Sequence, residues 1–202
     1  MKKKVMLCKI LRGVIIVFLL ILLPQTLGKA IIVTTAVDII PVMQEKSNWC
    51  WAACAEICGK NANPNSTRTQ RDVVRTIKGS SLPNVTGTLR QSEIGTEYVA
   101  MSVMDYLYGE IRLDYSQITE CLAHGYAVQA AAGIYSLDGV RQGGHMVVIN
   151  MTQFVDIVGE NPYRLTYYDP NDGLSYTCTY EEFCNGSFNG RRYDQTVYVE
   201  VE

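Results

Sequence analysis

The spacing of hydrophobic positions along the chain changes near residue 126. Upstream of that point, apolar residues recur every three or four positions and the stretches end at glycines, which is typical of amphipathic helices. Helices are predicted at residues 50–58, 69–78, 98–107 and 114–124, with stops at Gly59, Gly79, Gly109 and Gly125.

The second half of the chain has the pattern of short β-strands. Apolar and β-branched runs alternate with Gly, Asn, Asp and Pro, and their short connections favour antiparallel pairing. Helices followed by an antiparallel sheet define the α+β class, and no repeat or linker indicates a second domain. Strands are predicted at residues 126–135, 145–155, 163–170, 174–180 and 195–202, after a first strand at 31–43 that ends near Pro41.

The first thirty residues have a different composition from the rest of the chain. Lys2–Lys4 form a basic start, Val14–Leu23 is an unbroken apolar run, and Ala30 is a small residue at the expected cleavage point. This pattern predicts a signal peptide over residues 1–30 and a secreted or periplasmic domain over residues 31–202. A retained membrane anchor is the alternative, although the apolar run is short against the roughly 20 residues of a bilayer span.

Removing the predicted signal peptide changes the charge of the chain. Six of the 18 basic residues and none of the 20 acidic residues lie in residues 1–30, so residues 31–202 carry 12 basic and 20 acidic residues, a formal charge of −8. A surface of that sign repels nucleic acid and anionic membranes. Nucleic acid and lipid are therefore set aside as main partners, no stable membrane contact is expected after cleavage, and the sequence indicates no cofactor.

One short motif carries the candidate chemistry. Cys50 lies between Trp49 and Trp51 at the start of the predicted helix over residues 50–58. A thiol attacks a carbonyl only as the thiolate, and the pKa of a free thiol is about 8.5. Unpaired N–H groups at a helix start favour an anion, and a neighbouring imidazolium lowers the thiol pKa further. Cys50 is therefore the predicted nucleophile.

The chain has two histidines, and their contexts differ. His124 lies in the last turn of a predicted helix, where a structural role at the helix dipole is favoured. His145 follows two glycines and starts a predicted strand, so it is the predicted partner of the thiol. The next strand ends at Asp169, which predicts a carboxylate beside the imidazole. Asn171 and Asp172 are the alternatives, and a turn role is favoured for both.

Gln44 is the candidate donor for an oxyanion hole. A tetrahedral intermediate of acyl transfer needs hydrogen-bond donors aimed at its oxyanion. The backbone N–H of Cys50 supplies one donor. The side-chain amide of Gln44, six positions upstream, supplies a second donor if the intervening loop folds it back.

Gln44 and the tripeptide Cys-Trp-Ala that begins at Cys50 resemble the signature of papain-like cysteine peptidases. The segments around His145 and Asp169 are similar, in the same order, to those of bacterial secreted or effector peptidases and double-glycine leader peptidases. The resemblance covers about residues 40–200. It implies a two-lobe fold, with the nucleophile helix in an N-terminal helical lobe and an antiparallel sheet in the C-terminal lobe. It also implies a cysteine peptidase that cleaves a protein or peptide substrate in the groove between them.

Two other functions fit parts of the same pattern. Acyl transfer or amide hydrolysis, as in transglutaminases or cell-wall amidases, would use the same Cys–His–Asp set with another acceptor. A non-catalytic, disulfide-stabilised secreted binding module would instead hold Cys50 in a disulfide. Besides Cys50, the predicted mature chain has Cys54, Cys58, Cys121, Cys178 and Cys184, of which the last two could be bridged across a turn.

Overall fold

The computed structural model describes residues 31–101, 106–109, 112–187 and 190–199. The strands are β1 (Ile31–Ala36), β2 (Tyr106–Gly109), β3 (Val128–Tyr135), β4 (Arg141–Asp156), β5 (Tyr163–Asp169), β6 (Leu174–Thr179) and β7 (Arg191–Val199). The helices are α2 (Cys50–Ala62), α3 (Gln70–Lys78), α4 (Leu89–Ala100), α5 (Tyr115–Ala123) and α6 (Tyr180–Asn185).

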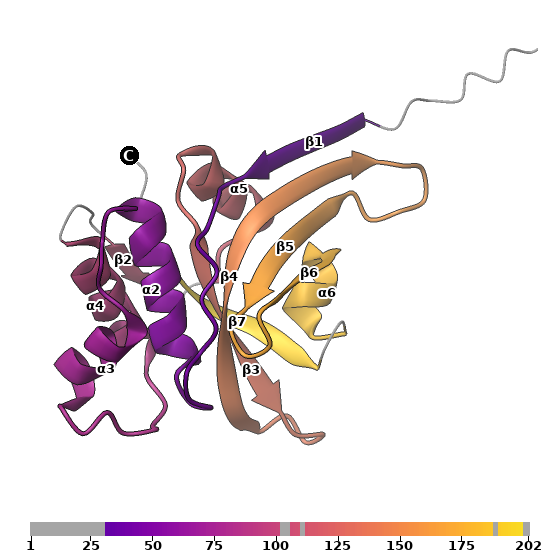
Figure 1. Cartoon of the computed structure of the whole chain (residues 1–202). Coiled ribbons are helices and arrows are strands. Elements are labelled where there is room, and N and C mark those ends of the chain that lie inside the picture. The colour runs from indigo at the N-terminus through magenta and orange to yellow at the C-terminus, as the bar shows by residue number, and fades with distance from the viewer. Residues whose placement is uncertain (1–30, 102–105, 110–111, 188–189, 200–202) are drawn as a thin grey trace, which may run out of the picture. The chain divides into compact units, whose positions relative to one another are not determined.

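One antiparallel sheet organises the unit Ile31–Glu202. Its strand order is β2-β7-β3-β4-β5-β6, and β1 pairs with the C-terminal part of the long strand β4 (Figure 1). All pairings between the described strands are antiparallel. The structure therefore confirms the predicted α+β class with an antiparallel sheet.

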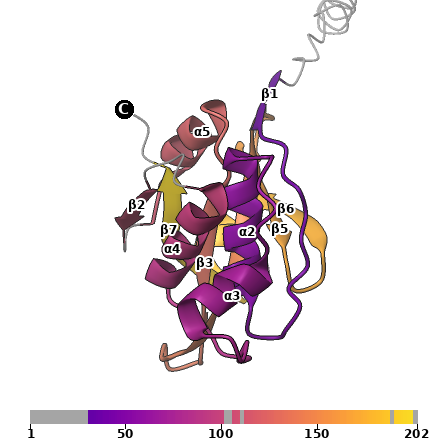
Figure 2. The same cartoon turned by 60° about the vertical axis from the view of Figure 1, so that its left-hand side comes forward.

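Two hydrophobic cores lie on opposite faces of this sheet. Helices α2, α3 and α4 are grouped together (Figure 2) and pack on one face, while α5 and α6 contribute to the core on the other. Side chains alternate along β4, so Met146 and Val148 enter the first core and Val147 and Ile149 enter the second. Because both faces of β4 are buried at this point, Met146–Ile149 is a continuous apolar run.

Helix α2 does not end at Gly59, as the sequence predicted, but continues to Ala62. Gly59 has another role, because a Cβ built there would lie 2.5 Å from Cβ of Val99 and 3.0 Å from the carbonyl oxygen of Thr96. The missing side chain lets α2 and α4 approach each other closely at this position.

The predicted helix over residues 98–107 is wrong. Helix α4 begins earlier, at Leu89, and ends at Ala100, where Met101 takes a left-handed conformation with φ 62°. Part of the predicted range instead forms the edge strand β2, because its backbone pairs with β7. Val103 and Met104 of that prediction lie outside the described residues.

The bounds of two strands and the presence of one helix also differ from the sequence prediction. Strand β1 ends at Ala36 rather than near Pro41, because β3 occupies the same edge of β4 over residues Arg141–Ile149. Strand β4 begins at Arg141, so His145 lies inside the strand and not at its start. Helix α6 was not predicted; the Thr179 hydroxyl accepts a hydrogen bond from the backbone N–H of Glu182 at its first turn.

None of the helices in the described ranges combines the length and apolar character needed to cross a bilayer. The predicted signal peptide over residues 1–30 lies outside the described residues and stays a prediction.

The close approach of α2 and α4 predicts that Gly59→Ala destabilises the fold. Overpacking costs about 1–3 kcal/mol, and the better helix propensity of alanine offsets at most ~1 kcal/mol of it. We expect a lower urea midpoint for this variant. Gly143→Ala is the control, because a Cβ there meets no atom within 4 Å. Equal midpoints for the two variants would contradict this role of Gly59.

Candidate active site

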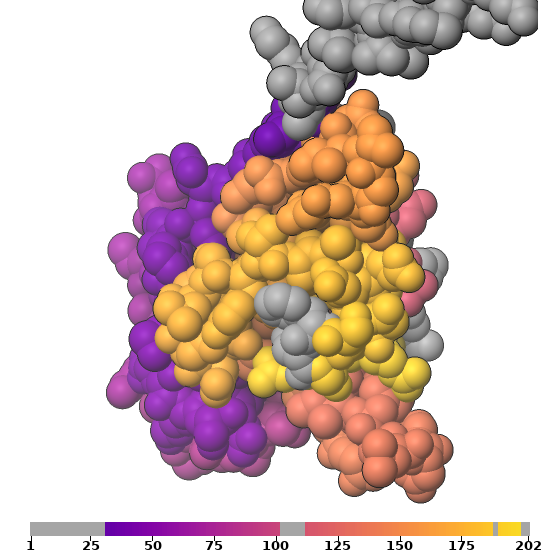
Figure 3. Space-filling view, turned by 90° about the vertical axis from the view of Figure 1, so that its right-hand side faces the viewer, coloured from indigo at the N-terminus to yellow at the C-terminus, as the bar shows by residue number. Residues whose placement is uncertain are grey.

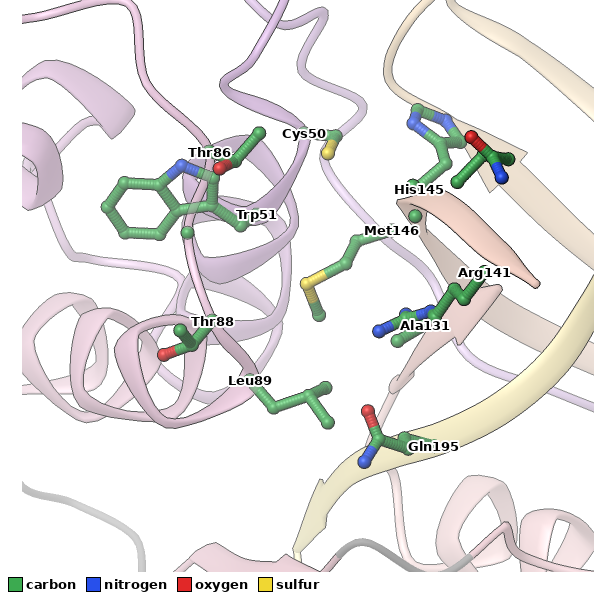
Figure 4. A pocket seen from close by; sticks show the side chains of 14 residues that line it. Cys50, Trp51, Thr86, Thr88, Leu89, Ala131, Arg141, His145, Met146 and Gln195 are labelled. Atoms are coloured by element: carbon green, nitrogen blue, oxygen red, sulfur yellow. The ribbon is translucent and has the colours of Figure 1, made fainter. Parts of the chain in front are cut away.

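The structure brings Cys50, His145 and Asp169 together, although they lie on three elements. Cys50 is the first residue of α2, His145 lies in β4, and Asp169 is the last residue of β5. The Nε2 atom of His145 is 2.6 Å from Oδ1 of Asp169. The Cys50 thiol hydrogen-bonds with the same ring, which leaves Nδ1 as the nitrogen that faces sulfur. Figure 4 shows the sulfur of Cys50 directed from α2 toward the His145 side chain.

The register of β4 and β5 explains this meeting. Val148 pairs with Tyr168, so the next residue along β5, Asp169, lies opposite the segment of β4 that contains His145. Strand β5 ends there, and the edge of β4 beyond it is open to α2. At this open edge, the backbone N–H of Met146 donates a hydrogen bond to the sulfur of Cys50.

The surroundings of the site favour an ionised Cys–His pair. Burial raises the pKa of the Cys50 thiol, but His145 and the backbone N–H groups of Trp51 and Met146 outweigh it and hold that pKa below its ordinary value. Burial lowers the pKa of His145, but its hydrogen bond to Asp169 and the contact with Cys50 raise it to about 9. Near neutral pH, thiolate and imidazolium therefore stabilise each other.

Asp169 is the carboxylate that orients the imidazole. It is 4% exposed, and its Oδ2 is 3.0 Å from Nη1 of Arg191 on β7. Burial raises the pKa of its carboxyl, but His145, the backbone N–H of Asn171 and the charge of Arg191 lower it below its ordinary value. Sequence reasoning missed Arg191, since no local motif marks it.

The residues considered as alternatives to Asp169 and His145 make other contacts. Asn171 reaches the site only through its backbone N–H, which donates to Oδ1 of Asp169. Asp172 accepts hydrogen bonds from the backbone N–H of Leu174 and the hydroxyl of Tyr176, as expected of a turn residue. His124 caps the end of α5, where its Nδ1 lies 2.9 Å from the carbonyl oxygen of Glu120.

A groove of about 570 Å³ opens in front of Cys50 and His145. Its size falls in the range of ordinary ligand sites. Met146 and Leu89 give it an apolar surface, and Gln195 and Arg141 give it polar groups (Figure 4). The cysteine therefore faces a space that can hold a chain segment of a substrate.

The two indoles beside Cys50 shape the wall of this groove. Trp49 donates its Nε1–H to the carbonyl oxygen of Pro83 at 2.9 Å, and Trp51 donates to that of Val85 at 3.3 Å. A Cβ on Gly87 would lie 2.3 Å from the ring of Trp51, so the loop lies flat against the indole. The helix start that carries the thiol thus also anchors the loop that faces it.

Gln44 lies near these residues, but its amide has other partners. Its backbone N–H donates to the carbonyl oxygen of Pro170 at 2.8 Å. Its Nε2 donates to the carbonyl oxygens of Lys46 and Ser47, and its Oε1 is buried without a hydrogen-bond partner. Gln44 does not contribute to the described lining of the groove, so its oxyanion role stays a prediction.

The six cysteines in the described ranges form no disulfide with one another, so the bridge considered between Cys178 and Cys184 is not formed. Cys178 points into the second core, whereas the Cys184 thiol hydrogen-bonds with Tyr180. Burial raises the pKa of Cys121 to about 11 and that of Cys178 to about 12. Cys50 is the thiol that its surroundings activate.

No protein-family model matches the chain, and a search of curated proteins found no match.

The contact with His145 predicts fast, pH-dependent alkylation of Cys50. Iodoacetamide modification, followed for each cysteine by mass spectrometry, should be fastest at Cys50 and should reach its plateau below the pH typical of a free thiol. His145→Ala removes the imidazolium but leaves the burial, so alkylation at pH 7 should slow by at least about tenfold. His124→Ala is the matched control and should change nothing. Equal effects of the two histidine variants would contradict the pairing.

The ion pair with Asp169 predicts that Arg191 positions the carboxylate. Arg191→Met should free Oδ2 of Asp169, weaken its hold on the imidazole and slow Cys50 alkylation at pH 7 roughly fivefold, the effect of about 1 kcal/mol. The pH profile should shift to higher pH, and Arg191→Lys should restore part of the shift. A purely structural role would lower stability and leave the alkylation profile in place.

Proposed function

We propose that this protein is a secreted cysteine peptidase with a papain-like two-lobe arrangement. Helices α2, α3 and α4 would form the first lobe, and the sheet with α5 and α6 the second. Residues 1–30 would be its signal peptide. One observation carries the proposal: the Cys50 thiol and the Asp169 carboxylate contact the same imidazole, that of His145, and this pair faces a groove.

The geometry supports acyl transfer through a thioester. The thiolate of Cys50 forms a bond to the carbonyl carbon, and the carbonyl electron pair moves onto oxygen as an oxyanion. Its collapse breaks the C–N bond, while the imidazolium of His145 gives its proton to the leaving amine. Asp169 holds the ring in position and stabilises its positive charge.

Water completes the reaction. The neutral imidazole of His145 takes a proton from a water molecule, whose oxygen bonds to the acyl carbon. The C–S bond then breaks and releases a carboxylic acid, which restores the thiolate and the imidazolium. Gln44 would donate to the oxyanion in both stages after its amide leaves the carbonyl oxygens of its own loop.

The alternatives differ in what they require of Cys50. A binding module built on disulfides requires a bridged Cys50, whereas Cys50 is a free thiol. A transglutaminase-like or amidase reaction would use the same three residues and differ only in the acceptor or in the amide attacked. Product analysis therefore separates that alternative from hydrolysis of peptide bonds.

The proposal predicts hydrolysis of denatured casein by the full chain. New amino termini should appear, Cys50→Ala should abolish them, and Asp169→Asn should lower kcat/KM by about 10²- to 10⁴-fold. Activity should rise with pH as Cys50 ionises and fall as pH passes about 9, where His145 loses its proton. Asp172→Asn is the matched control, because Asp172 accepts hydrogen bonds from Leu174 and Tyr176 of β6 and not from His145.

Other products would identify other functions. Incorporation of a fluorescent amine into casein without new amino termini would favour acyl transfer to an amine. Labelling by a thiol-reactive epoxide that is spread over several cysteines, with no cleavage, would contradict catalysis by Cys50.

A further inference from the structure

One cation, Arg141, lines the groove beside Cys50 and has donors that no hydrogen bond of the described residues uses. Arg141 starts β4, four residues before His145, and lines the same groove. Its Nε lies 3.6 Å from Oδ2 of Asp194, which is beyond hydrogen-bonding distance. Within the described part of the chain, its Nη1 and Nη2 make no hydrogen bond. Figure 4 shows its guanidinium reaching into the groove toward Met146.

Two glycines lie between this side chain and His145. A Cβ on Gly144 would lie 2.9 Å from Nη2 of Arg141, so the guanidinium lies directly against this position of the backbone. A Cβ on Gly143 would meet no atom within 4 Å. Gly143 and Gly144 therefore leave bare backbone next to the ring of His145, open to a substrate.

The charge of the groove contrasts with that of the rest of the protein. Residues 31–202 have a formal charge of −8. No acidic side chain contributes to the described lining of the groove, whereas Arg141 does. Asp194, the carboxylate nearest to Arg141, already accepts a hydrogen bond from the Tyr135 hydroxyl at 2.7 Å. The guanidinium is thus only partly neutralised and keeps its paired N–H donors for another anion.

We propose that Arg141 binds a carboxylate of the substrate, so that the groove selects acidic peptides. The two Nη groups of Arg141 form a planar fork that matches the two oxygens of a carboxylate. A carboxylate is therefore sufficient as the ligand, and a larger anion such as phosphate is not required. The carboxylate can come from an Asp or Glu side chain near the scissile bond or from a free carboxyl terminus. This inference rests on the proposed peptidase function.

The hairpin that carries Arg141 provides a matched control. Arg192 lies on the neighbouring strand β7, with its guanidinium 3.8 Å from the centre of the Tyr135 ring, and does not belong to the described groove lining. Arg192→Gln therefore makes the same change of charge near the same hairpin, which projects at the lower right of Figure 3. It should lower the overall charge without touching the proposed carboxylate site.

The test is a cleavage profile of a peptide library by the full chain, with mass-spectrometric mapping of every cut. In one arm the peptides have amidated carboxyl termini, and in the other the termini are free. Enrichment of Asp and Glu at one fixed position in both arms identifies a side-chain carboxylate. Cuts at a fixed distance from the end, only in the free arm, identify the terminal carboxylate. Either pattern supports the proposal.

Matched peptides then measure the preference. The peptide with the preferred carboxylate should have a kcat/KM about 10- to 100-fold above its amide analogue, the range of a charge-assisted hydrogen bond. Arg141→Gln should reduce that ratio to about one while cleavage of the amide peptide persists. Arg141→Lys should give an intermediate ratio, because it keeps the charge and loses the fork. Arg192→Gln should keep the full ratio.

Three results would overturn the proposal. The first is cleavage by the wild-type chain with no carboxylate preference in either arm, which leaves the peptidase function intact. The second is an equal loss of preference in Arg141→Gln and Arg192→Gln, which would indicate general electrostatics. The third is the absence of any cleavage together with slow labelling of Cys50, which refutes the peptidase function and this inference with it.

Discussion

The buried charges of the site set the main constraint on this fold. Cys50, His145, Asp169 and Arg191 form a row of alternating sign when the thiol and the imidazole are ionised. Taking an ion out of water costs several kcal/mol, and a protein tolerates it when opposite charges and hydrogen bonds surround the ion. The four residues come from α2, β4, β5 and β7, so the active state requires these elements to keep their relative positions.

A buried polar network holds the nucleophile helix in that position. The Ser92 hydroxyl on α4 lies 2.8 Å from the carbonyl oxygen of Trp51 and 2.5 Å from Oε1 of Gln129 on β3. The amide of Gln129 donates to Thr96 at 2.6 Å, so α2, α4 and β3 share one set of hydrogen bonds. Such a network is costly when a member is lost, because each partner is buried. It ties the start of α2 to the sheet that carries His145.

The candidate chemistry could be predicted from the sequence because its residues are few and ordered along the chain. The chain has two histidines, so His145 is the remaining candidate for the partner of the thiol once His124 is assigned to a helix end. The end of α4 was harder to predict from the sequence, since Met101 and not a glycine follows its last residue, Ala100. The start of α4 has a local signal, because Thr88 and Gln91 form a capping box. Arg191 depends on a contact between strands that are not neighbours, which local patterns do not encode.

The position of Cys50 between two tryptophans has a physical explanation in the groove wall. Both indoles are at most 1% exposed, and each donates to a carbonyl oxygen of the loop before α4. A smaller residue at either position would remove the hydrogen bond that anchors this loop. It would also leave a cavity beneath the loop. Both indoles pack into the first core, and Trp51 also lines the groove beside the thiol. The same short motif therefore places the Cys50 thiol toward β4 and anchors the loop that faces it.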